Sequence, residues 1–290
     1  MNKFQLLTDS CVDLPSGFVE ELDVKVIPLS FSIQDKEYLN YLDERESSNQ
    51  QFYQLLRERV ISKTTQINEY RFIEFFEPFL QEGYDILYIG FSSALSGTYN
   101  SSVQAANELQ TKYPNQKIIT IDSLAASMGQ GLLVTYAARL KKEGKSLEEI
   151  VKWVEDNKRK ICHLFTVGDL NYLRRGGRLS YSKALLGTIL RVKPLLHVSN
   201  EGKLVQTGMK RGRMSALDAM ISRLVETIEN PEGQTIFISH GDCLDDAEYV
   251  KEQIKAKLPV GEIMIHYIGP VIGSHSGLDT LAIFYYGNDR

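Results

Sequence analysis

Short apolar runs alternate with longer amphipathic stretches along this 290-residue chain, and this alternation constrains its fold most. Apolar runs of about four to eight residues predict strands, and stretches of roughly ten or more with apolar residues three or four apart predict helices. Strands that alternate with helices are typical of βαβ units, so we predict an α/β fold with largely parallel sheets. The predicted strands are residues 4–7, 24–31, 86–89, 118–121, 164–167, 195–198, 235–239 and 263–267. The predicted helices are residues 51–60, 70–82, 98–112, 129–143, 147–160, 214–229 and 244–258.

Capping signals mark several of these helix ends. Ser146 and Glu149 have the spacing of a capping box at the start of the 147–160 helix. Gly144 follows a lysine-rich helix end, where a left-handed cap residue is expected. Pro78 lies inside the 70–82 stretch and predicts a kink or a split there.

The length suits two medium-sized domains. The helix predicted at 147–160 closes a first α/β unit, and a second begins near Cys162. We therefore predict an N-terminal α/β domain at residues 1–162 and a C-terminal α/β domain at residues 163–290.

Composition excludes several classes of function. The net charge of -4 and the pI of about 5.8 disfavour nucleic-acid binding, because such proteins neutralise phosphates with basic residues. Three widely spaced cysteines without a CxxC motif do not form a disulfide framework. The N-terminal residues lack the long apolar region of a secretion signal, and no apolar run approaches the roughly 20 residues of a membrane span. We therefore expect a cytoplasmic protein.

The segment at residues 84–107 is the most informative for chemistry. A predicted strand ends at Gly90, a loop of small residues follows, and a helix begins near Gly97. Free backbone N–H groups and a positive dipole at the start of a helix bind anions, and open α/β sheets bind ligands at this edge. The loop has no phosphate-binding lysine motif, so a compact anion such as a carboxylate fits best. Its serines, Ser92, Ser93 and Ser96, equally suit simple helix capping.

Two further segments offer groups for an anion. Thr64 and Thr65 lie in a predicted polar loop at 61–68, where threonine also serves as a helix cap. His275 lies between two serines in a predicted glycine-rich turn, where it can donate an N–H and gain charge below about pH 6.5. An exposed loop histidine explains the same pattern.

Basic residues form two clusters. Arg174, Arg175 and Arg178 bracket two glycines, and Arg211 belongs to a second cluster just before a predicted helix. Guanidinium groups on a tight turn suit phosphate or carboxylate. A solvated basic turn is the alternative.

Together and in this order, the motifs resemble the DegV family of bacterial fatty-acid-binding proteins, and the resemblance covers essentially the whole chain. The motifs are TDSCVDLP at 8–15, VIPLSF at 26–31, KTTQIN at 63–68, FSSALSGTYNS at 91–101, IDSLAASMGQG at 121–131, NYLRRGGRLS at 171–180, ILRVKPLL at 189–196 and IGPVIGSHSG at 268–277. Each motif alone is weak, but eight in order are specific.

The resemblance implies two α/β domains with an acyl chain buried between and within them. It places the fatty-acid carboxylate on Thr64 or Thr65, on Ser93 with its neighbours Ser92 and Gly97, and on His275. It also implies a protein that is not an enzyme and has no cofactor beyond the bound fatty acid.

The resemblance further implies a partner. The protein would present its long-chain fatty acid to a separate ATP-dependent fatty acid kinase, which makes the acyl-phosphate, and transient contact with a membrane surface would supply the lipid. The arginines Arg174, Arg175, Arg178 and Arg211 are the expected contacts to the kinase or the acyl-phosphate.

Two departures from the family pattern bear on ligand preference. The usual TSQPS reads TTQIN here, and the usual TGPG-like run after the histidine reads SGLD, with Asp279 in place of a small residue. The first change alters the loop over the head group. The second brings a carboxylate close to the anion site or turns it to solvent.

Two enzyme hypotheses compete with the carrier. A serine-dependent lipid hydrolase or acyltransferase would use Ser93 and His275, with Asp122 or Asp279 as the third group, yet the sequence around Ser93 lacks the GxSxG pattern. A metal-dependent enzyme would use scattered side chains without standard ligand spacing. Those side chains are His240, Asp242, Cys243, His266 and His275.

Overall fold

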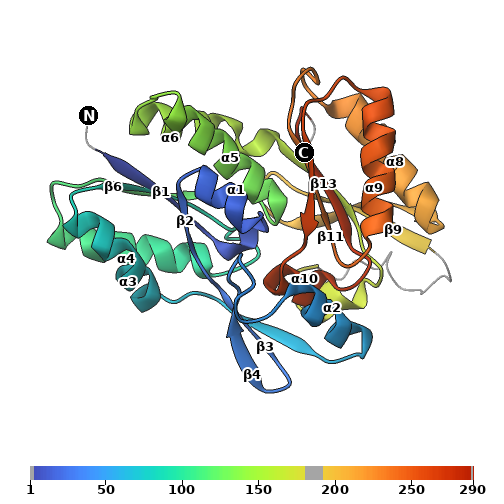
Figure 1. Cartoon of the computed structure of the whole chain (residues 1–290), viewed down its shortest axis with the longest axis horizontal. Helices are drawn as coiled ribbons and strands as arrows, with labels where there is room; N and C mark the ends of the chain where they lie inside the picture. The colour runs from blue at the N-terminus through green and yellow to red at the C-terminus, as the bar shows by residue number, and fades with distance from the viewer. Residues whose placement is uncertain (1–2, 180–191, 289) are drawn as a thin grey trace.

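The computed structural model describes residues 3–179, 192–288 and 290, and these residues form three β-sheets with helices packed around them (Figure 1). Ser180 and residues 189–191, which complete two of the motifs quoted above, lie outside the described residues. Within the described part of the chain, no helix is long and apolar enough to cross a membrane.

The first sheet is parallel and is covered on both faces. Its order is β2 (Val24–Ile27), β1 (Phe4–Asp9), β6 (Asp85–Gly90) and β7 (Ile118–Asp122). Successive side chains of a strand point to opposite faces. Leu87 therefore packs toward α5 (Met128–Lys142), whereas Ile86 and Tyr88 pack toward α3 (Glu69–Gln81) and α4 (Thr98–Lys112). Burial on both faces explains why these strands read as continuous apolar runs.

The second sheet is mostly antiparallel. Its order is β10 (Leu204–Arg211), β9 (Val192–Val198), β8 (Ile161–Thr166), β13 (Leu281–Tyr286), β11 (Ile236–His240) and β12 (Ile263–Tyr267). Of its described pairings, β11 with β12 is parallel and the others are antiparallel. Helices α8 (Arg213–Thr227) and α9 (Leu244–Lys257) pack on this sheet. The predicted α/β class is confirmed, but only the first sheet is parallel throughout, because in the second sheet β13 returns antiparallel between β8 and β11 and β9 and β10 are also antiparallel.

A small third sheet connects the two large ones at the bottom of Figure 1. It consists of β4 (Lys36–Leu39), β3 (Ser30–Ile33) and β5 (Ser62–Thr65), and both its pairings are antiparallel. The single strand predicted at 24–31 is wrong, because the chain divides there into β2 and β3 around Pro28, which has no N–H for a ladder. The loop predicted at 61–68 is also wrong in part, because residues 62–65 form β5.

The remaining helices are short or peripheral. They are α1 (Ser16–Glu21), α2 (Asn49–Arg57), α6 (Leu147–Asn157), α7 (Asn171–Arg175) and α10 (Pro270–Ser276), with 3-10 turns at Ser10–Val12 and Lys158–Lys160. The predicted capping box of Ser146 and Glu149 is present at α6, and Gly144 has a φ of 83° as predicted. Helix α3 continues through Pro78 without a split.

One hydrophobic core lies between the two large sheets. It joins Leu6 of β1 and Leu132 of α5 to Phe165, Phe237 and Phe284 of the second sheet. The predicted division at residues 162 and 163 therefore crosses a shared core, and the domain boundary itself stays a prediction.

A buried carboxylate fixes the carboxyl edge of the first sheet. Asp9 ends β1, and its side chain accepts hydrogen bonds from the N–H groups of Cys11 (3.0 Å) and Phe91 (2.9 Å), from the Tyr88 hydroxyl (2.7 Å) and from the Gln130 amide (3.2 Å). Burial raises the pKa of Asp9, and these four donors oppose that effect. The bonds connect the loops after β1 and β6 with α5.

A second buried acid, Asp13, lies in the loop after β1 in a left-handed conformation, with a φ of 50°. Its Oδ2 accepts a hydrogen bond from the Ser127 hydroxyl at 2.6 Å, and the Ser239 hydroxyl lies 3.1 Å from that of Ser127. Burial raises the pKa of Asp13 from 3.8 to about 7. The folded protein therefore holds a proton here across a pH range in which the unfolded chain has released it.

Asp13→Asn should change how stability depends on pH. Between pH 5 and 7 the folded wild type binds one more proton at this position than the unfolded chain, so its free energy of unfolding falls relative to the variant as pH rises. The difference should fall by about 1.4 kcal/mol per pH unit and level off above about pH 7. Asparagine tolerates the left-handed conformation, so the backbone is preserved.

Urea unfolding of both proteins from pH 5 to 8 measures this difference. The histidines are common to both proteins, so their titration cancels. A difference that stays constant over this range would contradict the raised pKa.

Candidate ligand-binding site

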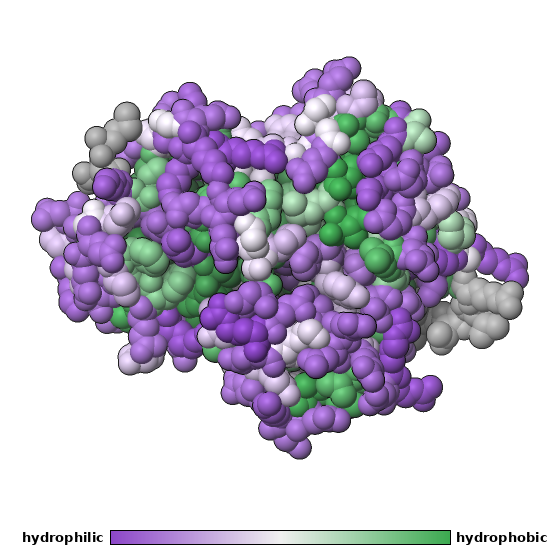
Figure 2. Space-filling view, in the orientation of Figure 1, coloured by the Kyte–Doolittle hydropathy of each residue, from purple (hydrophilic) through white to green (hydrophobic). Residues whose placement is uncertain are grey.

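A cavity of about 370 Å³ lies among the three sheets and receives residues from β5, β8, β11, α10 and β13. This volume falls within the range of about 300–1,000 Å³ for small-molecule sites. Figure 2 shows a mostly hydrophilic outer face, with hydrophobic residues visible between the region around the first sheet and the region around the second sheet.

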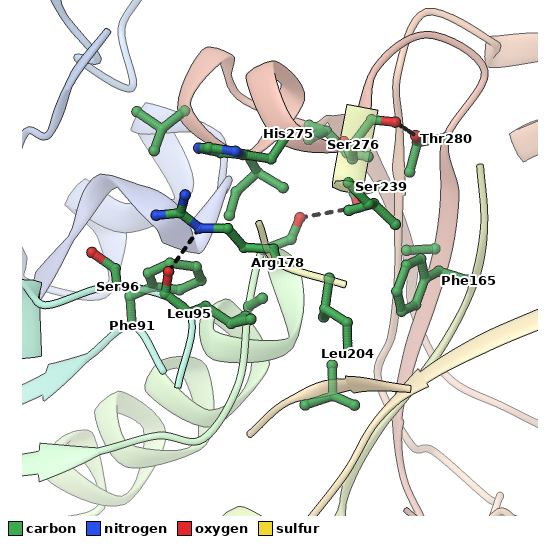
Figure 3. A pocket seen from close by; sticks show the side chains of 18 of the residues that line it. Phe91, Leu95, Ser96, Phe165, Arg178, Leu204, Ser239, His275, Ser276 and Thr280 are labelled. Carbon is green, nitrogen blue, oxygen red and sulfur yellow. Dashed lines mark hydrogen bonds between the residues drawn. The ribbon is translucent and has the colours of Figure 1, made fainter. Parts of the chain in front are cut away.

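Aromatic and aliphatic side chains make up much of the cavity wall. Phe91 and Leu95 come from the loop after β6, Phe165 from β8 and Leu204 from β10 (Figure 3). Phe284 of β13 also lines the cavity. Phe165 and Phe284 also belong to the core between the two large sheets. The cavity is therefore continuous with the hydrophobic core.

A pair of hydrogen bonds joins β5 to α10 beside the cavity. The Thr64 hydroxyl lies 2.8 Å from Nε2 of His275, and the Ser62 hydroxyl lies 2.7 Å from that of Ser274. Thr64, Thr65 and His275 all line the cavity. The structure thus brings together these three residues, which the sequence analysis had named on separate segments.

The charge state of His275 differs from the expectation. The residue lies in the last turn of α10 rather than in a glycine-rich turn. Burial, followed by the nearby charges of Arg178 and Arg175, lowers the pKa of His275 to about 4. The expectation that it gains charge below about pH 6.5 is therefore wrong, and at neutral pH the ring is neutral with one N–H to donate.

The serine loop after β6 is arranged differently from the prediction. Ser96 lines the cavity, and its hydroxyl also accepts a hydrogen bond from the N–H of Thr98 at the start of α4. Ser93 is absent from the described lining residues, and its N–H donates to Asp122. The fully buried Ser92 donates its hydroxyl to the backbone of Gly202 instead.

Gly97 is the N-cap residue of α4 and lies outside the described cavity lining. A β-carbon at this position would come within 2.2 Å of the side chain of Gln66, which does line the cavity. The glycine therefore makes room for a cavity side chain. The useful sequence signal was the serine directly before the helix cap, which points to Ser96 rather than Ser93.

The predicted arginines separate into two groups. Arg178 lines the cavity, where its Nε donates to the carbonyl of Leu95 at 3.0 Å, and burial lowers its pKa. Arg174, Arg175 and Arg211 lie outside the described lining. Arg175 is exposed, with its guanidinium 4.9 Å from the centre of the Tyr172 ring, and Arg211 is exposed at the end of β10. Arg178 is therefore a cavity residue, although the sequence predicted it only as a contact to the kinase or the acyl-phosphate.

The polar side of the cavity suits an anion. It combines the Arg178 guanidinium with the neutral ring of His275 and the hydroxyls of Thr64 and Ser96. No acidic side chain occurs among the described residues that line the cavity. Hydrogen bonds from charged and neutral donors offset the cost of burying a carboxylate.

Neither enzyme hypothesis receives support from these contacts. His275 bonds to Thr64, and Ser93 lies outside the described lining, so no described contact joins the serine and histidine of the hydrolase hypothesis. The described residues also contain no group of three or more His, Cys, Asp or Glu side chains that could hold a metal ion.

Comparisons with known proteins identify the family. A family model described as "Uncharacterised protein, DegV family" matches residues 3–288. The DegV domain-containing protein CPE0026 of Clostridium perfringens is 48% identical over 290 residues, which cover 100% of this chain and 99% of the relative.

Solved structures of similar proteins share the fold. A DegV family protein from Thermus thermophilus, described for its fatty acid binding, has a TM-score of 0.88 and 29% identity, covering 99% of this chain and 100% of its own. DegV of Bacillus subtilis, described as a fatty acid binding protein, has a TM-score of 0.87 and 28% identity with the same coverage. From the family match and these likenesses, we conclude that the chain belongs to the DegV family.

Proposed function

We propose that this protein is a non-catalytic carrier that binds one long-chain fatty acid in the cavity. The carboxylate contacts Thr64, Ser96, His275 and Arg178, and the acyl chain lies along the apolar wall. The observation that carries this proposal is an apolar cavity with a cation and hydroxyls on one side and no acidic residue in its described lining. The fatty acid binding described for the Thermus and Bacillus proteins supports it.

The acyl chain would supply most of the affinity. Each buried methylene contributes about 0.8 kcal/mol, so a chain of about sixteen carbons contributes roughly 10 kcal/mol before ordering costs. The carboxylate adds less, because it exchanges water for protein donors. Its contacts instead fix the orientation of the ligand in the cavity.

We further propose that the loaded protein works in the cytoplasm and presents the fatty acid to a separate fatty acid kinase. Such an encounter needs an exposed basic surface near the head group, because an acyl-phosphate and ATP are both anionic. Arg175 is exposed and belongs to the same segment as the cavity residue Arg178, which supports this role. Arg211 offers a second exposed cation on β10. Short contacts with a membrane surface would supply the lipid.

Ser96→Ala should weaken fatty-acid binding, and Ser93→Ala should not. Removing one hydrogen bond to a carboxylate costs about 1.5–3 kcal/mol, which corresponds to roughly a tenfold to hundredfold rise in Kd. Ser93 is the matched control, because it belongs to the same loop but lies outside the described cavity lining.

Native mass spectrometry should find one fatty acid per chain in the wild-type protein, and competition with a fluorescent fatty acid gives each Kd. A protein that is empty and takes up no added fatty acid would sink the proposal. Loss of binding in Ser93→Ala, with Ser96→Ala unaffected, would return the carboxylate to Ser93.

The titration of His275 should respond to the ligand. Without fatty acid its pKa is about 4. A bound carboxylate favours the charged ring, so the pKa should rise. His240 is an internal control, because its pKa is also lowered to about 4 but it lies outside the described lining. Histidine NMR spectra with and without oleate from about pH 4 to 8 give both values, and identical curves for His275 would contradict the carboxylate position.

Arg175→Glu should slow formation of acyl-phosphate by the kinase and leave fatty-acid binding intact. Reversing an exposed charge at an encounter surface lowers the association rate, here by about tenfold at low salt, and the effect shrinks as salt rises. Lys152→Glu on α6 makes the same charge change at another exposed position. Equal rates for both variants would exclude this surface.

A further inference from the structure

A second polar group lines the cavity away from the proposed carboxylate position. Its members are the hydroxyls of Ser127, Ser239, Ser276 and Thr280. In Figure 3, Ser239, Ser276 and Thr280 lie to the right and Ser96 to the left, with Arg178 and His275 between them. A saturated acyl chain has no atom that can hydrogen-bond to any of these hydroxyls, so the carrier function leaves this part of the wall unexplained.

Ser276 is the most informative member of this second polar group. Its side chain lines the cavity, the residue is only 5% exposed, and its hydroxyl has no hydrogen-bond partner among the described residues. Its backbone carbonyl accepts from the Thr280 hydroxyl at 2.9 Å, so the helix end is fixed there. Buried hydroxyls normally have a partner, which indicates that this one meets a polar group of the ligand.

Asp13 sets the direction of the neighbouring hydrogen bonds. The Ser127 hydroxyl donates its one proton to Asp13 at 2.6 Å. Ser239, 3.1 Å from Ser127, must therefore donate its own proton to Ser127. The free lone pairs of Ser239 then accept hydrogen bonds from the cavity side.

The backbone conformation of Ser127 indicates that the orientation of these hydroxyls is fixed by the fold. Its φ of 53° and ψ of -146° lie in a region that residues other than glycine rarely adopt. Such conformations persist where the surroundings hold them, and here the buried Asp13 accepts the serine hydroxyl. The orientation of Ser239 is therefore built into the loop before α5.

We propose that the cavity selects fatty acids that carry a hydroxyl group along the acyl chain. The ligand hydroxyl donates to Ser239 and accepts from Ser276, while the carboxylate stays at Thr64 and Ser96. This inference rests on the proposed fatty-acid carrier function and names its substrate class. The positions of Ser239 and Ser276 relative to the carboxylate site then determine which carbon of the acyl chain must carry the hydroxyl.

Competition against one fluorescent fatty acid tests the proposal with stearic acid and with its 3-, 7-, 10- and 12-hydroxy derivatives. The measurement is made at pH 8, above the pKa of about 7 of Asp13. Burial of a hydroxyl without a partner weakens binding by about tenfold or more. One positional isomer should escape this loss and bind at least as tightly as stearate, whereas the others should bind more weakly.

Ser276→Ala should abolish the preference. The favoured isomer should lose about tenfold in affinity, and stearate should bind as before or more tightly. Because the Ser276 hydroxyl has no described partner in the protein, its removal should leave the melting temperature unchanged. Ser102→Ala is the control, because this buried serine lies on α4 and outside the described lining. Ser239→Ala provides a second variant with the same expected loss.

The possible results separate the two proposals. If stearate binds but every hydroxy isomer is weaker by a similar factor in wild type and in Ser276→Ala, the hydroxyl selectivity is wrong and the carrier function stands. The same holds if a favoured isomer keeps its advantage in both serine variants. If neither stearate nor any isomer binds, the carrier function itself fails.

Discussion

The carboxylate of Asp9 is the interaction on which the rest of this structure depends. It accepts hydrogen bonds from the backbone after β1, from the backbone after β6, from Tyr88 and from α5. A buried charge without partners would be too costly, so all four donors must be in place together. Phe91, one of these donors, begins the loop that reaches the cavity at Leu95 and Ser96. Asp9 in the first sheet therefore helps to fix the position of the loop that lines the ligand site.

Distant parts of the chain complete the site. Thr64 and His275 are 211 residues apart, yet they form one hydrogen bond, and Ser62 and Ser274 repeat the connection beside it. Arg178 reaches the same cavity from the segment after α7 and is held by the carbonyl of Leu95. The small third sheet, which packs against α2 through Phe31 and Ile33, therefore positions one wall of the cavity against α10.

Local pattern predicted the helices well, because an amphipathic face and a cap such as Ser146 are encoded within a few neighbouring residues. Sheet direction was predicted poorly, because the antiparallel place of β13 beside β8 depends on pairing across more than a hundred residues. The same dependence on contacts between distant residues limited the prediction of the site. Thr64, Thr65 and His275 were found from their motifs, and all three line the cavity. The choice of Ser93 over Ser96, and the inward position of Arg178, depend on loop geometry that spacing alone does not encode.

The continuity of the cavity with the core has a consequence for the protein as a whole. Phe165 and Phe284 line the cavity and also hold the two large sheets together. On the proposed function, a bound acyl chain packs against the same side chains and becomes a replaceable piece of the hydrophobic interior. Binding of a fatty acid would then fill the cavity in the hydrophobic interior, and its release would leave that cavity empty. The free energy of unfolding would thus be highest while the fatty acid is bound and lowest just after its transfer. The rate at which the protein unfolds and is degraded in the cell would then depend on the supply of lipid.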